Sequence, residues 1–134
     1  MNKFWILSLF YFAFCPYLAL SQNEFIESLT NGATTIDDLI NRVPNEMRRN
    51  QMYMNESRAL HREAVSHENP RSILFNNDAS ALLTFNSDPN SPTYNQVEAL
   101  VFDPITLKPN VYLISFKNGK PIVKPNPREC MGCH

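Results

Sequence analysis

The chain has 134 residues, with 12 Lys and Arg against 13 Asp and Glu and a formal net charge of −1. This balance excludes the strongly basic footprint of a nucleic-acid-binding domain, and the charges are too scattered along the chain to predict a polybasic membrane patch. The three glycines form no phosphate-binding loop, and neither G-x-S-x-G nor H-E-x-x-H occurs. The sequence therefore indicates no known class of enzyme.

The first 21 residues have the pattern of a signal peptide. Lys3 precedes an apolar run from Phe4 to Leu20, and Ala19-Leu20-Ser21 forms a small-x-small cleavage site. We predict removal of residues 1–21, which leaves Gln22 as the mature N-terminus and no stable membrane span. The alternative is an uncleaved anchor, but its apolar run is at the lower limit for a span and contains Pro16. The prediction implies a secreted protein, located in the bacterial periplasm.

Residues 22–67 are predicted to form a helical N-terminal segment. Phe25, Ile26 and Leu29 recur at helical spacing before Asn31-Gly32. A second helix is expected from Thr35, with Asp38 at the capping-box position, until Pro44 ends it. Asp37 and Asp38 are interpreted as an acidic pair in the first turn, where negative charge interacts favourably with the helix dipole.

The stretch from Asn45 to His67 has weak periodicity. We expect a short strand or irregular piece near Gln51 to Met54, and a helix from about Ser57 to Val65. The methionines here are candidate haem ligands, although core gap-filling is the simpler interpretation. These methionines are Met47, Met52 and Met54. The same stretch contains His61 and His67, which are interpreted as surface residues.

Residues 68–125 change to period-two alternation, which predicts an antiparallel β-domain. In the clearest strand, from Tyr94 to Asp103, Val97, Ala99 and Val101 share one face and Glu98 lies on the other. We predict that Glu98 forms a structural ion pair with Arg71, since a buried carboxylate needs a partner. The remaining predicted strands are Ser72–Phe75, Ser80–Phe85, Val111–Phe116 and, after the Asn118-Gly119 turn, Pro121–Lys124. The predicted fold class is α+β: N-terminal helices packed on an antiparallel meander of about four to five strands, ending in a short helix.

Residues 126–134 end in Cys130-Met131-Gly132-Cys133-His134, which is the C-x-x-C-H motif of c-type haem attachment. Two thiols three residues apart on a helical turn can form thioethers with the two haem vinyl groups. His134 would then be the axial ligand of the haem iron. Asn126, Pro127 and Glu129 suit a helix start before the motif. The predicted cofactor is therefore covalent haem c, with Cys130, Cys133 and His134 as the site and no catalytic residue.

Three alternatives remain open. The C-x-x-C pair could be a dithiol–disulfide redox module, because a helix N-terminus depresses thiol pKa values. The β-domain could instead be a secreted binding domain that carries no haem. A zinc site would have to borrow His61 or His67 to complete four ligands.

The order of segments resembles an uncharacterised family of secreted bacterial proteins that carry a C-x-x-C-H motif. The resemblance implies a periplasmic haem-binding protein with a sensor-like or docking β-domain, a periplasmic redox partner and no known reaction. Members of that family continue past the motif, so we expect this chain to be an N-terminal portion that lacks the second axial ligand. The matching segments are Leu39–Pro44, Asn55–Leu60, Pro70–Phe75, Leu83–Asn86, Val97–Asp103, Ile114–Phe116 and Asn126–Pro127, followed by Cys130.

Overall fold

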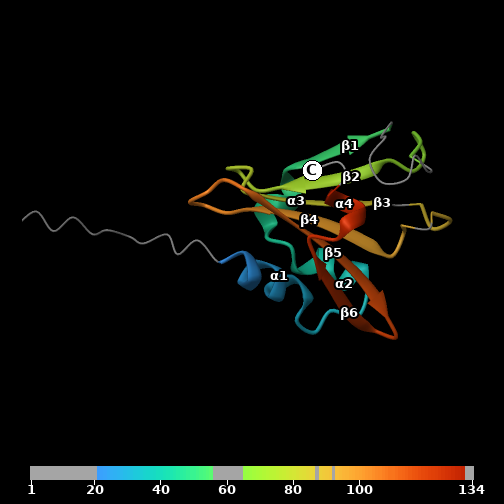
Figure 1. The fold of residues 1–134 in the computed structure, drawn as a ribbon. Coiled ribbons are helices and arrows are strands. Elements are labelled where there is room, and N and C mark those ends of the chain that lie inside the picture. The colour runs from blue at the N-terminus through green and yellow to red at the C-terminus, as the bar shows by residue number, and fades with distance from the viewer. Residues whose placement is uncertain (1–20, 56–64, 87, 92, 132–134) are drawn as a thin grey trace, which may run out of the picture.

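A single antiparallel sheet dominates the computed structural model, which describes residues 21–55, 65–86, 88–91 and 93–131 (Figure 1). Its six strands lie in chain order, so each strand pairs with its neighbours in sequence. This is a meander, the topology that short connections between antiparallel strands favour. The strands are β1 (Gln51–Met54), β2 (Arg71–Phe75), β3 (Ala81–Asn86), β4 (Gln96–Phe102), β5 (Pro109–Lys117) and β6 (Lys120–Pro125).

Four short helices accompany the sheet in the described part of the chain: α1 (Gln22–Thr30), α2 (Ile36–Arg42), α3 (Asn45–Arg49) and α4 (Arg128–Met131). The Ser21 hydroxyl accepts from the Glu24 N–H, and the Glu24 carboxylate accepts from the Ser21 N–H, which completes a capping box on α1. The Thr35 hydroxyl caps α2 by accepting from the Asp38 N–H. The Asp38 carboxylate, however, accepts from Thr34 and leaves the predicted box on α2 half formed.

One face of the sheet carries the main core. Val97, Ala99 and Val101 of β4 all belong to it, as predicted from their alternation. Leu29 and Leu39, from α1 and α2, are completely buried in the same cluster, and burying each such side chain contributes roughly 2 kcal/mol. Figure 1 shows α2 and α3 behind the sheet and α4 in front of it, so different helices pack on the two faces of the sheet.

The predicted fold class is wrong in two respects. The sheet has six strands rather than four to five, and the helices are few and short, with nine, seven, five and four residues. The sixth strand is β1, at the residues where a short strand or irregular piece was expected, and its Met52 and Tyr53 are 51% and 56% exposed. An edge strand of this kind shows no alternating apolar pattern, because backbone hydrogen bonds to β2 create it. The structure is therefore mostly a six-stranded sheet.

Two other predictions lie largely outside the described residues. Most of the signal peptide and most of the helix expected from about Ser57 to Val65 fall there; of that helix only Val65 is described, and it is not helical. No helix in the described ranges is long and apolar enough to span a bilayer.

Candidate functional site

The segment that leads into the C-x-x-C-H motif is attached to β5. Asn126 donates its backbone N–H to the Val111 carbonyl at 2.6 Å, and its side-chain oxygen accepts from the Val111 N–H at 2.9 Å. Its φ of +44° lies in the left-handed region, which Asn tolerates better than most residues. The Asn126 side chain thus bonds to the sheet instead of capping the helix, which differs from its predicted N-cap role. The turn ends β6 and directs the chain across the sheet.

Helix α4 begins immediately afterwards and contains the first motif cysteine. The N–H groups of Cys130 and Met131 both donate to the Pro127 carbonyl, at 3.0 and 3.2 Å. Cys130 is only 3% exposed. Because α4 lies on the face opposite α2 and α3 (Figure 1), this residue belongs to the second face of the sheet. On that face Val111 and Leu113 are also buried.

The structure places only part of the predicted haem site. Cys130 has a defined, buried position, whereas Cys133 and His134 lie outside the described residues. Within the described ranges no group of three or more His, Cys, Asp or Glu side chains is arranged to hold a metal ion.

The methionines and histidines considered from the sequence as metal ligands lie in different parts of the structure. Met47 is 1% exposed inside the main core, which supports its interpretation as a gap-filling residue. Met52 is 51% exposed on β1, so gap-filling does not describe it. His67 is exposed, as expected, and His61 lies outside the described residues.

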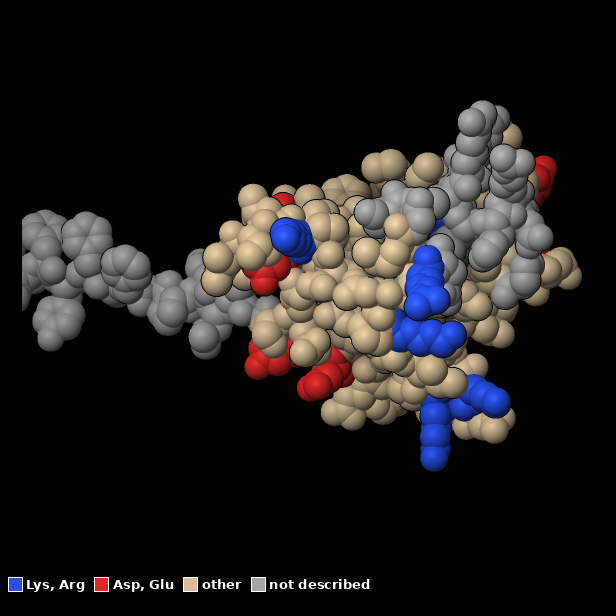
Figure 2. Space-filling model, in the orientation of Figure 1, with Lys and Arg blue, Asp and Glu red and all other residues tan. Residues whose placement is uncertain are grey.

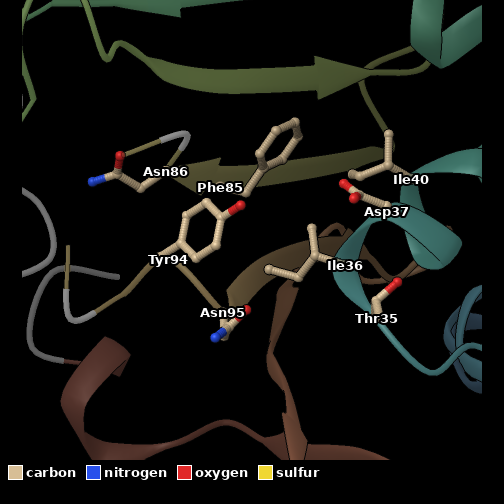
Figure 3. A pocket seen from close by; sticks show the side chains of 8 residues that line it. All are labelled: Thr35, Ile36, Asp37, Ile40, Phe85, Asn86, Tyr94 and Asn95. Carbon is tan, nitrogen blue, oxygen red and sulfur yellow. The ribbon is translucent and has the colours of Figure 1, made fainter. Parts of the chain in front are cut away.

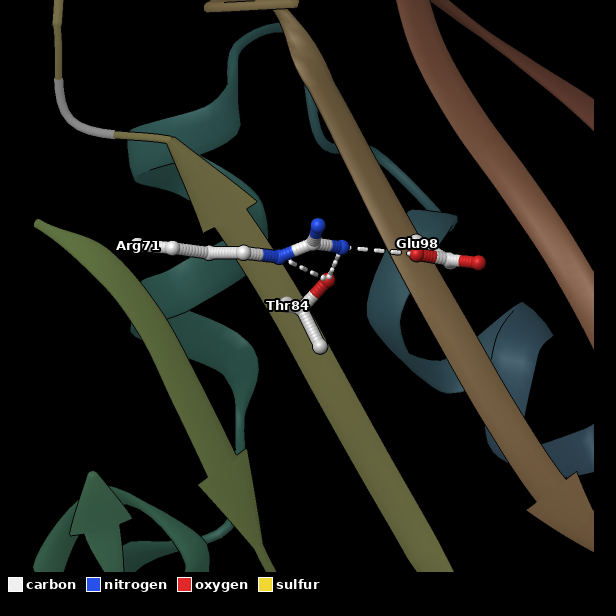
Figure 4. Close-up of polar contacts among 3 residues, drawn as sticks. All are labelled: Arg71, Thr84 and Glu98. Atoms are coloured by element: carbon white, nitrogen blue, oxygen red, sulfur yellow. Dashed lines mark hydrogen bonds and ion pairs between the residues drawn. The ribbon is translucent and has the colours of Figure 1, made fainter. Parts of the chain in front are cut away.

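The predicted ion pair between Arg71 and Glu98 is present (Figure 4). Arg71 Nη2 lies 2.7 Å from Glu98 Oε2, and the two side chains are 9% and 5% exposed. Arg71 also donates from Nε to the Thr84 hydroxyl at 3.2 Å. Thr84 and Glu98 are paired across β3 and β4, so three adjacent strands supply this cluster. The buried guanidinium holds the Glu98 carboxylate in place, which agrees with the predicted structural ion pair.

A cavity of about 400 Å³ lies between α2 and the end of β3 (Figure 3). The rings of Phe85 and Tyr94 line it together with the carboxylate of Asp37. The Asn86 amide is fixed there, because it donates to Ser91 Oγ at 3.2 Å and accepts from the Asp88 N–H at 2.9 Å. The other lining residues are Thr35, Ile36, Ile40 and Asn95.

This lining offers two rings, one carboxylate and two amides, which could orient a small polar molecule. Among the described residues that line it, Asp37 is the one with a carboxylate side chain. No periodic pattern in the sequence indicates this cavity.

Comparison with known proteins provides no relative. The chain matches no protein-family model, no curated protein and no solved structure.

Proposed function

We propose that the protein is an exported, periplasmic c-type haem protein that acts in electron transfer or haem-based sensing. Cys130 and Cys133 would hold the porphyrin through thioethers, and His134 would ligate the iron. The observation that carries this proposal is the C-x-x-C-H motif, whose first two residues, Cys130 and Met131, lie in the helical turn that follows the Asn126 attachment to the sheet. Bound haem would supply a one-electron redox change or a site for small ligands at its iron.

The local geometry fits this role in two ways. The α4 turn gives Cys130 helical backbone geometry, and continuing that turn would place Cys133 on the same side of the helix. The burial of Cys130 also keeps its sulfur inside the protein, where a thioether to a large apolar ring is expected. Because α4 has four residues, opening it during haem attachment has a small free-energy cost compared with global unfolding.

The dithiol–disulfide function is the second candidate. A C-x-x-C redox module attacks its substrate through an accessible thiolate. At 3% exposure, Cys130 is poorly placed to be that attacking group. Haem attachment also requires Cys130 to become accessible, so its burial bears on both functions and the haemochrome test decides between them.

The test is expression of the full chain in a bacterial periplasm together with cytochrome c maturation enzymes. We expect covalent haem, seen as a pyridine haemochrome spectrum and as an intact mass increased by one haem. The paired substitution Cys130→Ala and Cys133→Ala should abolish it. Cys15→Ala is the matched control, because it removes a thiol that lies within the predicted signal peptide.

Two results would contradict the proposal. The first is a folded, exported protein without covalent haem under conditions in which a control cytochrome is matured. The second is covalent haem that persists after both cysteines are replaced. A reversible disulfide between the two cysteines, with a measurable reduction potential and no haem, would support the dithiol alternative instead.

A further inference from the structure

The segment that precedes the C-x-x-C-H motif has a local charge unlike that of the whole chain. From Pro104 to Arg128 it contains five Lys and Arg and no Asp or Glu, although the chain has a net charge of −1. Along the sequence these charges look scattered. In the structure, four of them lie on the β5–β6 hairpin and α4, and we call them the basic face: Lys117, Lys120, Lys124 and Arg128.

Strand register explains why the hairpin residues share a side. Lys117 pairs with Lys120, and Leu113 pairs with Lys124. Side chains that alternate along β6 at roughly 7 Å intervals place Lys120, Ile122 and Lys124 on the side of Leu113, which is the side that α4 covers (Figure 1). Figure 2 shows Lys and Arg side chains gathered on the lower right of this face, without acidic side chains between them in that view.

Exposed apolar side chains accompany these charges. Ile122 of β6 is 39% exposed, and Met131, next to Cys130 in α4, is 47% exposed. The four basic side chains are exposed as well. Apolar contacts with a charged rim are the usual composition of a protein–protein interface. Salt screens exposed charges of this kind, so an approaching molecule experiences them most strongly at low ionic strength.

We propose that the basic face docks an acidic redox protein, which exchanges electrons with haem bound at the neighbouring motif. This inference rests on the proposed function, since the haem supplies the electron. The position of Arg128 and Met131 inside the helix that enters the motif would bring the partner close to the haem. A small, charge-steered interface suits a transient electron-transfer complex. A few basic side chains on a chain of negative net charge do not make a nucleic-acid site.

The experiment measures haem reduction by small probes of opposite charge. The holoprotein is mixed in a stopped-flow instrument with the anionic reductant Fe(II)–EDTA, or with the cationic reductant hexaammineruthenium(II). We expect the anionic probe to react faster at low ionic strength and to slow as salt is added. The triple substitution Lys117→Glu, Lys120→Glu and Arg128→Glu should slow the anionic probe by about tenfold or more at low salt without slowing the cationic one.

A matched control separates local charge from net charge. Arg48→Glu, Arg49→Glu and Lys108→Glu change the net charge by the same amount, at exposed positions of α3 and the β4–β5 connection. This control should retain most of the rate with the anionic probe. Equal slowing by the two triple variants would overturn the proposal, because the effect would then follow from net charge alone.

A binding measurement identifies the class of partner. The haem-free variant with both motif cysteines replaced by alanine is titrated with a fluorescein-labelled octaglutamate peptide and with phosphatidylserine vesicles. Peptide binding that weakens with the basic-face triple variant supports an acidic protein partner. Binding to vesicles but not to the peptide overturns the proposal of an acidic protein partner in favour of a membrane surface.

If the haemochrome test shows no haem in the parent protein, the proposed function fails and the redox partner fails with it. If haem is present but the basic-face variant changes no rate, only the docking proposal fails.

Discussion

Replacing Glu98 with alanine tests the buried ion pair on the second face of the sheet. The substitution removes the carboxylate 2.7 Å from Arg71 Nη2 and leaves the guanidinium in a site where its side chain is 9% exposed. Breaking a buried pair by removing one partner costs about 3–5 kcal/mol of unfolding free energy. For a domain of this size, that loss corresponds to a decrease in Tm of roughly 12–20 °C.

The assay is urea unfolding followed by far-UV circular dichroism. Tryptophan fluorescence is unsuitable, because the single Trp of the chain, Trp5, lies within the predicted signal peptide. A double variant, Arg71→Met with Glu98→Leu, should recover most of the lost stability, since it replaces both charges with apolar groups of similar length. Thr84→Val should cost less than Glu98→Ala, because it removes only the hydrogen bonds that Arg71 donates from Nε and Nη2 to the Thr84 hydroxyl.

The reasoning would be refuted by a loss below about 1 kcal/mol for Glu98→Ala, which is the range of exposed ion pairs. If Glu98→Ala does not accumulate as folded protein, the comparison rests on Thr84→Val and the apolar double variant. If the Arg71→Met, Glu98→Leu variant then has the same free energy of unfolding as Thr84→Val, or a lower one, apolar side chains cannot substitute for the ion pair.

Three further predictions concern processing, pH and the haem ligand. Export should produce a mature protein that begins at Gln22, as N-terminal sequencing or intact mass would show; retention of Phe4 to Leu20 would disprove it. A variant that begins at Ser21 should be more stable by about 1 kcal/mol, because it keeps the hydroxyl that caps α1. The pKa of Asp38 is lowered by hydrogen bonds from Thr34, and that of Asp103 by hydrogen bonds from Thr106 and Ile105. Groups with a lowered folded pKa stabilise the fold above their unfolded pKa, so stability should fall as pH decreases below about 4. Replacing both residues with Asn should flatten this acid-side decrease in a pH series of urea midpoints. His134→Ala in the matured protein should remove the proximal ligand and change the haem absorption spectrum, whereas Met47→Leu, in the main core, should leave that spectrum unchanged.

Local chemistry made part of the fold predictable from the sequence. Asn118-Gly119 indicated a tight hairpin, and both residues adopt positive φ, at +54° and +70°, between β5 and β6. The alternation around Glu98 identified the core face of β4 and the need for a partner at Arg71, and both predictions are confirmed. The C-x-x-C-H motif is likewise a property of the sequence, and its haem remains a proposal.

Long-range pairing decided what the sequence pattern could not indicate. The sequence left Gln51 to Met54 open between a short strand and an irregular piece, and pairing with β2 makes it a strand although Met52 and Tyr53 remain exposed. Lys117, Lys120 and Lys124 share a side because the β5–β6 register aligns them. The cavity beside Tyr94 exists because α2 packs near the end of β3, and Cys130 is buried because Asn126 ties the chain to β5 and α4 lies over the second face. Apart from the β5–β6 register, which follows from the local Asn118-Gly119 turn, each of these features depends on segments that are distant in sequence, and local propensity contains no information about which distant segments meet.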